Sequence, residues 1–136
     1  MDLGLKTRIG DSFILWRLRH YAGYATTTTM QEFLRVAQDA AHQAGALLRD
    51  NWLKAKTIEV KTDMVDLVTN VDKASDALIT GILRTQFPTH QIIAEESAIS
   101  GQPSDYRWYI DPIDGTTNFA HSFPHFAVSI ALTHET

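Results

Sequence analysis

The 136-residue sequence contains no cysteine. This absence excludes a disulfide framework, a zinc–thiolate site and a thiol nucleophile, and it fits a reducing compartment. No apolar run approaches the length of a membrane-spanning helix. An excess of positive charge is also missing, because the net charge is −4 at pH 7. Composition therefore offers no electrostatic basis for binding nucleic acid or an anionic membrane.

What is present is the composition of an ordinary soluble domain. Hydrophobic residues make up 44% of the chain and charged residues 21%, close to the averages for globular proteins, and the length fits one domain. We therefore expect a cytoplasmic protein. A phosphate site in this acidic chain would have to recruit its own positive charge, which a metal ion would supply.

Residues 1–29 differ from the rest of the chain, since they are basic and end in a run of threonines. A basic, hydroxyl-rich start can be an organelle transit peptide, although the amphipathic pattern here is poor and two acids are present. We interpret 1–29 as an atypical extension upstream of Met30, with organelle targeting left open. The fold is assigned to residues 30–136.

Apolar periodicity predicts two helices with a strand between them. Residues 31–52 repeat at helical spacing, and a second helix is expected to begin at Thr69, where Thr69–Asp72 has the form of a capping box. Pro88 would end that helix. Between the two, residues 57–61 alternate as in a strand, and residues 62–66 are typical of a loop or hairpin turn.

Three further apolar runs predict strands. They are residues 91–94, 108–110 and 125–132, the last with alternating large and small side chains. The first run leads into Glu95 and Glu96, and the second ends at Asp111. Two strand ends that carry acids in one small domain indicate a functional site.

The segment from Trp108 to Phe119 contains the strongest chemical pattern. Pro112 cannot continue a central strand, so pairing should stop at Asp111, with Asp114 on the turn beyond it. Gly115 permits an unusual backbone angle or a close approach, and residues 116–117 offer hydroxyls and free N–H groups, as at a helix N-terminus. Two acids beside an anion site suggest a hard cation bridging to a phosphate. The alternative is an Asp-Gly turn in which the acids cap backbone groups.

Other candidates also have ordinary interpretations. Asp72 could simply stabilise a helix dipole, and Lys61 could be a solvated strand residue. His121 and His125 have metal-ligand spacing only on a helix, and Pro124 between them makes a continuous helix unfavourable. We expect neither histidine to bind metal.

Four motifs in order resemble the inositol monophosphatase family of magnesium-dependent, lithium-sensitive phosphatases. They are residues 66–69 with Asp72, 94–97, 111–119 and 121–124. The resemblance runs from about Met30 to the end of the chain. A haloacid-dehalogenase-type phosphatase is the nearest competitor, but its paired acids are two apart, whereas Asp111 and Asp114 are three apart.

The resemblance implies an α+β fold, a layered α/β sandwich with two long helices on a mostly antiparallel sheet. It also implies two or three Mg²⁺ ions and a small phosphorylated substrate. The implied metal ligands are Glu95, Asp111, the main-chain carbonyl of Ile113, and Asp114. Glu95, Asp72 and Thr116 would position a metal-activated water. The N–H groups of Gly115 and Thr116 would hold the phosphate, and Lys61 would lie on a mobile loop near a weaker third metal.

The implied function is a phosphomonoesterase that acts on inositol monophosphate, with a homodimer as in other family members. Histidinol phosphate, sugar bisphosphate and phosphoadenosine nucleotide remain alternative substrates, because the discriminating residues lie in the family's C-terminal half. The family's second metal also takes an aspartate from a Trp-Asp motif there, which this sequence lacks. We therefore expect an N-terminal half that is inactive or nearly so alone. A truncated homologue acting by interaction is a further alternative.

Overall fold

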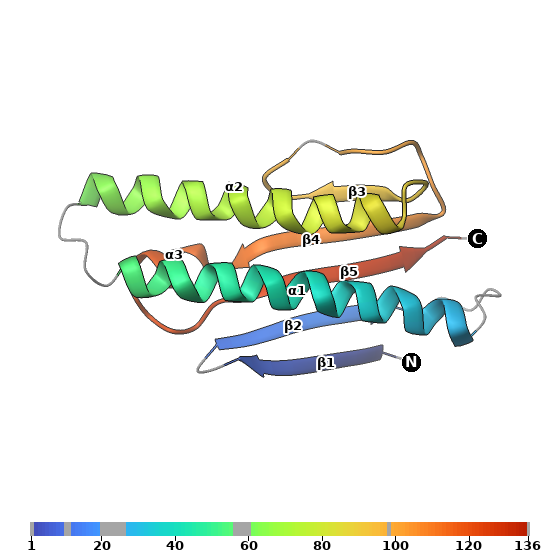
Figure 1. Ribbon diagram of the computed structural model, residues 1–136, viewed down its shortest axis with the longest axis horizontal. Helices are drawn as coiled ribbons and strands as arrows, with labels where there is room; N and C mark the ends of the chain where they lie inside the picture. The colour runs from blue at the N-terminus through green and yellow to red at the C-terminus, as the bar shows by residue number, and fades with distance from the viewer. Residues whose placement is uncertain (1, 10–11, 20–26, 56–60, 98, 136) are drawn as a thin grey trace.

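The computed structural model describes residues 2–9, 12–19, 27–55, 61–97 and 99–135, with side chains at 30–52, 54, 65 and from 68 onward within these ranges. Five strands and three helices follow one another in the order β1, β2, α1, α2, β3, β4, α3, β5 (Figure 1). Their bounds are β1 (Asp2–Ile9), β2 (Ser12–Arg19), α1 (Thr27–Ala55), α2 (Lys61–Gln86), β3 (Gln91–Ala94), β4 (Tyr106–Asp114), α3 (Thr116–Ala120) and β5 (Ala127–His134).

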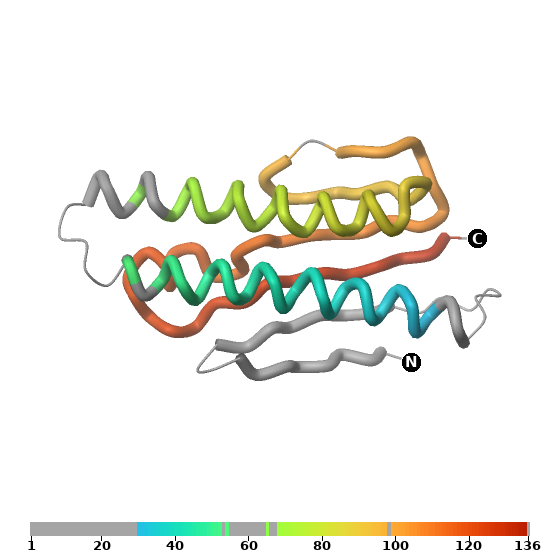
Figure 2. The backbone as a smooth tube through the Cα atoms, in the orientation of Figure 1, coloured from blue at the N-terminus to red at the C-terminus, as the bar shows by residue number. Residues whose placement is uncertain are grey.

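Helix α1 confirms the first predicted helix and extends it at both ends. Its buried residues recur every three or four positions, so one face packs inward while the opposite face stays in water. They are Phe33, Val36, Ala37, Ala40, Ala41, Ala44 and Leu48. The small alanines let this face lie close to its neighbours, and α1 runs beside α2 on the same side of the sheet (Figure 2).

Helix α2 corrects two predictions. Residues 62–66, expected to form a loop, are helical, and Thr69 lies inside the helix rather than at its N-cap. The reason is that the apolar stripe continues before Thr69: Val68 and Val71 are both buried, and tertiary packing overrides the weak helix propensity of the segment. A strand was expected at residues 57–61. Lys61 instead begins α2, and residues 57–60 lie outside the described residues.

The sheet is mixed rather than mostly antiparallel, with strand order β1-β2-β5-β4-β3. The pairs β1/β2 and β4/β5 are antiparallel, and β2/β5 and β3/β4 are parallel. Residues 2–9 and 12–19, which we left out of the fold on sequence grounds, form β1 and β2 and extend the sheet beyond β5. The aromatic and β-branched content of the β2 sequence favours strand.

The core lies between the sheet and the two long helices, which cover one face of the sheet (Figure 1). The predicted strands at 91–94, 108–110 and 125–132 are confirmed as parts of β3, β4 and β5. Side chains that face the helices, such as Trp108 and Ile130, are buried, whereas Tyr109 on the other face is 39% exposed. In the described part of the chain, no helix has the length and apolar content to span a membrane.

Candidate metal and phosphate site

The site begins where the regular pairing of β4 with β5 ends. Asp111 pairs with Ser129, but the register then shifts, and pairing resumes only at Asp114 opposite Ala127. The ladder is interrupted after Asp111, as predicted from Pro112, which has no N–H to donate. Asp114, predicted to lie on a turn beyond the strand, is instead the last residue of β4. Pro112 is buried while Asp114 is exposed, so the irregular segment is anchored in the core and presents carboxylates at the surface.

Three hydrogen bonds hold this segment from different elements. The N–H of Glu95, just after β3, donates to the carbonyl of Ile110 at 3.1 Å. The hydroxyl of Ser75 on α2 donates to the carbonyl of Pro112 at 3.1 Å. The hydroxyl of Thr116 on α3 donates to the carbonyl of Ile113 at 3.0 Å. The end of β3, the middle of α2 and the start of α3 therefore converge on the stretch of β4 that carries the acids.

Gly115 has the unusual backbone angle expected from the sequence, with φ 96° and ψ 38° in the left-handed region. A Cβ at this position would lie 2.9 Å from the carbonyl oxygen of His125, so the glycine also permits a close approach. Helix α3 begins at Thr116, as predicted, without a side-chain cap. The first turn of a helix leaves N–H groups without intrahelical partners, which suits an anion.

Asp72 projects from α2 into this convergence and is only 9% exposed. Burial, together with the nearby charges of Glu96, Asp111 and Glu95, raises its pKa from 3.8 to about 6. Its Oδ1 atom is buried without a hydrogen-bond partner. A buried carboxylate oxygen left unpaired is costly, so this atom lacks the partner that its surroundings call for.

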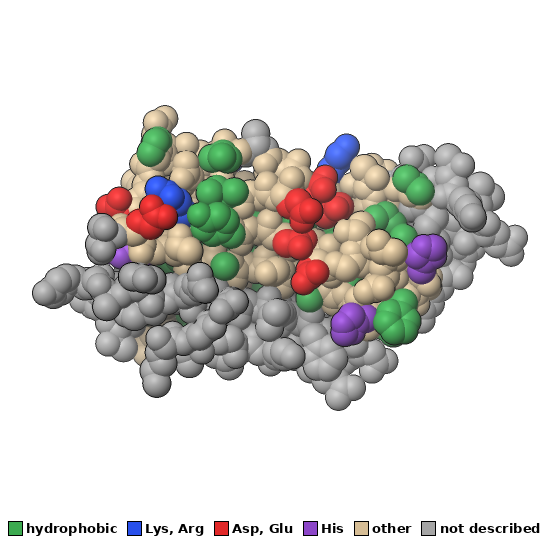
Figure 3. Space-filling model, turned by 180° about the vertical axis from the view of Figure 1, so that it is seen from behind, with side chains coloured by type: hydrophobic (Ala, Val, Ile, Leu, Met, Phe, Trp, Pro, Cys, Tyr) green, Lys and Arg blue, Asp and Glu red, His purple; other side chains and the backbone are tan. Residues whose placement is uncertain are grey.

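Asp111 is held in a similar state from the strand side. Burial and the charges of Glu95 and Asp114 together raise its pKa to about 6, against a hydrogen bond from the N–H of Ile113 that opposes the shift. Acidic side chains gather near the middle of the face seen in Figure 3. Since like charges at close range disfavour joint ionisation, this group is one that a cation would stabilise.

The donor set fits Mg²⁺ in kind. It consists of carboxylates and a main-chain carbonyl, and Mg²⁺ prefers oxygen ligands and retains several waters, so few protein ligands suffice. The unpaired Asp72 oxygen supports this fit. Within the described ranges, however, no three acids or histidines already stand at metal-ligand spacing. The carboxylates therefore share one electrostatic field but would have to draw closer around an ion.

The structure brings together most of the residues singled out from the sequence. Asp72, Glu95, Asp111 and Asp114 interact electrostatically, and Thr116 contacts Ile113 directly. Lys61 begins α2, and its side chain lies outside the described residues, so its expected role stays a prediction. His121 ends α3 and His125 lies beyond it, so no continuous helix joins the two histidines, as Pro124 predicted.

The sequence reasoning gave Glu96 no role of its own and did not single out Ser75. Glu96 has the largest electrostatic effect of any single side chain on Asp72, and its place beside Glu95 in the sequence was a usable signal. Ser75 lies three positions after Asp72, and residues at that spacing share one side of a helix. Its partner, the carbonyl of Pro112, is 37 residues away and leaves no trace in the sequence.

Comparison with known proteins identifies the family. The sequence model of the inositol monophosphatase family matches residues 29–136. The chain therefore belongs to the inositol monophosphatase family, which confirms the resemblance carried by the four motifs. The α+β arrangement of two long helices on a mixed sheet is shared with solved structures of that family.

Two curated relatives illustrate the sequence similarity. It is 48% identical over 111 residues to inositol monophosphatase 2 of Solanum lycopersicum, covering 78% of this chain and 42% of that protein. It is 47% identical over 106 residues to Nus factor SuhB of Pseudomonas aeruginosa, covering 75% and 39%.

Among solved structures, inositol monophosphatase from Anabaena superimposes with a TM-score of 0.64 at 43% identity, covering 77% of this chain and 36% of that one. Inositol monophosphatase II from Staphylococcus aureus gives a TM-score of 0.63 at 32% identity, covering 76% and 38%. The chain thus spans about two fifths of the length of the curated relatives it matches.

Proposed function

We propose that this chain carries the metal- and phosphate-binding part of a Mg²⁺-dependent phosphomonoesterase, with inositol monophosphate as the favoured substrate. Family membership supports a phosphatase, whereas the metal and the substrate belong to the proposal. One observation carries it: Asp72 and Asp111, from separate elements, share a field in which both pKa values rise to about 6. Such a cluster, next to the start of α3, suits a divalent cation and a phosphate.

Each side chain has a role that follows from its place. Glu95, Asp111, Asp114 and the carbonyl of Ile113 would hold the cation. Bound there, Mg²⁺ would offset the charge of the phosphate and lower the pKa of the attacking water. The fold contributes rigidity, because the segment that carries these ligands is tied to its neighbours at Ile110, Pro112 and Ile113.

The attacking water would be oriented by side chains that converge from two helices. Asp72, which has a buried oxygen without a hydrogen-bond partner, would accept a hydrogen bond from the water. Thr116 donates its hydroxyl proton to Ile113, so its oxygen lone pairs are left to accept from the water. Glu95 is the third side chain that would position the water. The N–H groups of Gly115 and Thr116 would hold the phosphate.

Substrate choice extends beyond these residues. In the family, the further aspartate for the second metal and the groups that recognise the ring come from a C-terminal half, and this chain spans about two fifths of its relatives. Histidinol phosphate, a sugar bisphosphate and a phosphoadenosine nucleotide therefore remain alternative substrates. We expect the 136-residue chain alone to release phosphate from inositol 1-phosphate slowly or not at all.

A Mg²⁺ titration followed by thermal unfolding tests the proposal. A ligand that binds only the folded state stabilises it by about 2.7 kcal/mol at 100 times its Kd, so the melting temperature should rise with Mg²⁺. Asp111→Asn is the matched variant, since it keeps the size of the side chain and removes the charge. A melting temperature that responds equally in both proteins, or in neither, would sink the proposal. Mn²⁺ provides a second ion for the same comparison.

A second candidate function is binding to a partner without turnover. It is favoured by the observation that, among the described residues, no three ligands are preset at metal-ligand spacing. A chain of this kind would associate with a full-length relative and would not respond to Mg²⁺. Size-exclusion chromatography of the two proteins mixed, with and without Mg²⁺, separates the candidates. A metal-stabilised chain that stays monomeric in the mixture supports the first.

A further inference from the structure

We infer that Ser75 is a positioning residue of the proposed metal site: its hydroxyl fixes the Asp111–Asp114 segment of β4 against the helix that carries Asp72. The inference rests on the proposed function, because a positioning role has meaning only if these carboxylates act together. It concerns a residue that touches neither substrate nor reacting atoms.

The contact itself is fully buried. Ser75 has 0% of its surface exposed, and its Oγ atom donates to the carbonyl oxygen of Pro112 at 3.1 Å. The two residues are 37 positions apart in the sequence, so this bond joins α2 directly to β4. A buried hydroxyl finds its partner inside the protein, and this one finds it in the segment that carries the acids.

Pro112 needs such a partner because of the interruption in β4. Asp111 and Asp114 of β4 each pair with a residue of β5, but the two residues between them have no pairing partner there. The carbonyl of Pro112 therefore has no place in the ladder, although the residue is buried. An unpaired buried carbonyl is unfavourable, and Ser75 supplies the missing donor from the neighbouring helix.

The position of Ser75 on α2 gives the bond its consequence. Ser75 follows Asp72 by three residues, so both side chains project from one side of the helix toward β4. The same bond that anchors Pro112 thereby sets the separation between Asp72 and Asp111. These carboxylates repel each other, since the charge of Asp111 contributes to the raised pKa of Asp72. The fixed contact between α2 and β4 opposes their separation before any cation binds.

The test compares Ser75→Ala with Ile79→Val. Ile79 lies one turn further along α2 and is also 0% exposed, so its truncation lowers stability without removing a hydrogen bond. Two readouts are used: the Kd for Mg²⁺ by calorimetry, and amide hydrogen exchange of residues 108–119 in the metal-free protein. Removing a group that orients a metal ligand weakens metal affinity by about 10- to 100-fold.

We expect Ser75→Ala to raise the Kd at least about tenfold and to speed exchange around Asp111–Asp114, while Ile79→Val leaves both unchanged. Unchanged affinity and exchange in Ser75→Ala would overturn the inference. Should that variant fail to fold, Ser75→Cys keeps the volume and a weaker donor, and the same shifts are expected at reduced size. A wild-type chain that binds no Mg²⁺ would instead refute the proposed function. Hydrogen exchange in the metal-free protein would still test whether the Ser75–Pro112 hydrogen bond holds the segment.

Discussion

At one end of β4, Trp108 is fully buried, and its indole N–H donates to Nδ1 of His90 at 3.0 Å. His90 stacks in turn on Phe87 and Tyr106, with ring centroids 5.0 and 4.6 Å apart. At the other end, Asp111 faces further carboxylates, and a buried oxygen of Asp72 lacks a partner. One strand thus passes from a region in which polar groups are paired to one in which like charges meet.

The difference between the two regions separates stability from chemistry. In the cluster of Phe87, His90, Tyr106 and Trp108, hereafter the aromatic end, packing and hydrogen bonding favour the same arrangement. At the carboxylate end they do not, because burial and repulsion both disfavour the charged form of the acids. Natural proteins accept such local conflict mainly where a site requires it. Removing a buried side chain at the aromatic end should therefore lower the free energy of unfolding, whereas neutralising acids at the carboxylate end should raise it when no metal is bound.

The largest expected effect is at the aromatic end. Trp108→Ala should lower the free energy of unfolding by about 3–5 kcal/mol, because it removes a fully buried indole and leaves a cavity. Urea denaturation measures this loss. Tyr109→Ala is the control on the exposed face of the same strand, and it should cost much less. Similar losses for the two variants would contradict the packing described for β4.

A second prediction concerns the turn into the carboxylate end. Gly115→Ala should destabilise the protein by about 1–2 kcal/mol, because an L-residue in the left-handed region meets its own backbone and its Cβ would lie 2.9 Å from the carbonyl of His125. Thermal unfolding measures the change. Gly81→Ala is a matched control of opposite sign: it has nothing within 4 Å of the added Cβ and should stabilise α2 by about 0.5–1 kcal/mol.

The two ends should also respond to pH in opposite directions when metal is absent. The pKa values of Asp72 and Asp111 are raised from 3.8 to about 6 in the folded protein. Their contribution to the free energy of unfolding is therefore fully present below pH 3.8 and is lost as pH rises through 6. Burial lowers the pKa of His90 from 6.5, so its contribution is present above pH 6.5 and is lost as pH falls.

Melting temperatures between pH 4 and 8, measured with a chelator, check this opposition. In Asp111→Asn, acidification should add less stability through the acids than it does in the wild type. The destabilising effect of His90 protonation should therefore dominate more strongly in this variant. Asp50→Asn, at an exposed position of α1, should leave the profile unchanged. Identical profiles for wild type and Asp111→Asn would mean that the acids do not interact as described.

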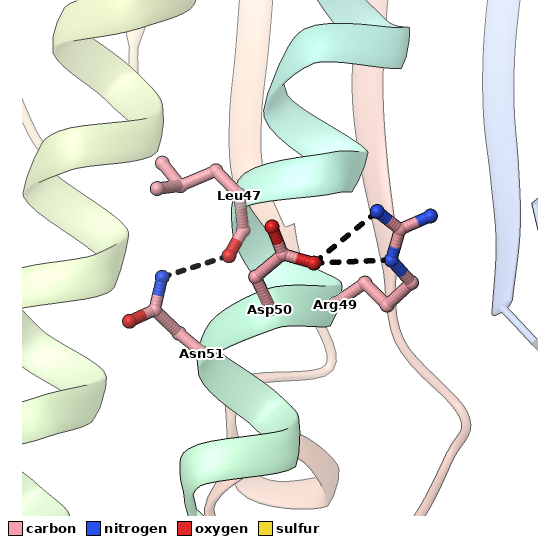
Figure 4. Close-up of polar contacts among 4 residues, drawn as sticks. All are labelled: Leu47, Arg49, Asp50 and Asn51. Atoms are coloured by element: carbon pink, nitrogen blue, oxygen red, sulfur yellow. Dashed lines mark hydrogen bonds and ion pairs between the residues drawn. The ribbon is translucent and has the colours of Figure 1, made fainter.

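The smallest expected effect lies outside both ends, on the water-facing side of α1. Arg49 contacts Asp50 at 3.2 Å, with their side chains 47% and 61% exposed (Figure 4). Exposed ion pairs contribute about 0–1 kcal/mol, so Arg49→Ala should change stability by less than about 0.5 kcal/mol. Chemical denaturation in low and high salt measures it. A larger, salt-dependent loss would show that this surface contributes more than its exposure indicates.

The sequence predicted the local features of β4 well and those of α2 poorly. Three features follow from the backbone chemistry of single residues: the interruption of strand pairing at Pro112, the unusual backbone angle at Gly115 and the helix start at Thr116. The start of α2 does not, because packing of Val68 extends the helix through a segment whose composition favours a loop. Likewise, the parallel pairing of β2 with β5 joins distant segments, and no local pattern encodes it.

The candidate site divides in the same way. Its acids could be named from strand ends and motif spacing, since each lies at a recognisable position. The interactions among them could not, because the proximity of Glu96 to Asp72 and the bond from Ser75 to Pro112 depend on how α2 docks against the sheet. Residue identity is local information, whereas electrostatic coupling depends on the assembled fold.

The bond between Ser75 and Pro112 closes a loop of 37 residues, and this has a kinetic consequence. The entropy of closing such a loop must be lost before the contact forms, so Asp72 and Asp111 meet only once α2 has docked on β4. If docking follows the rate-limiting step, a cation held by Asp111 beside Asp72 will leave the folding rate nearly unchanged and slow unfolding instead. Bound metal would then extend the lifetime of the native state rather than guide the chain toward it.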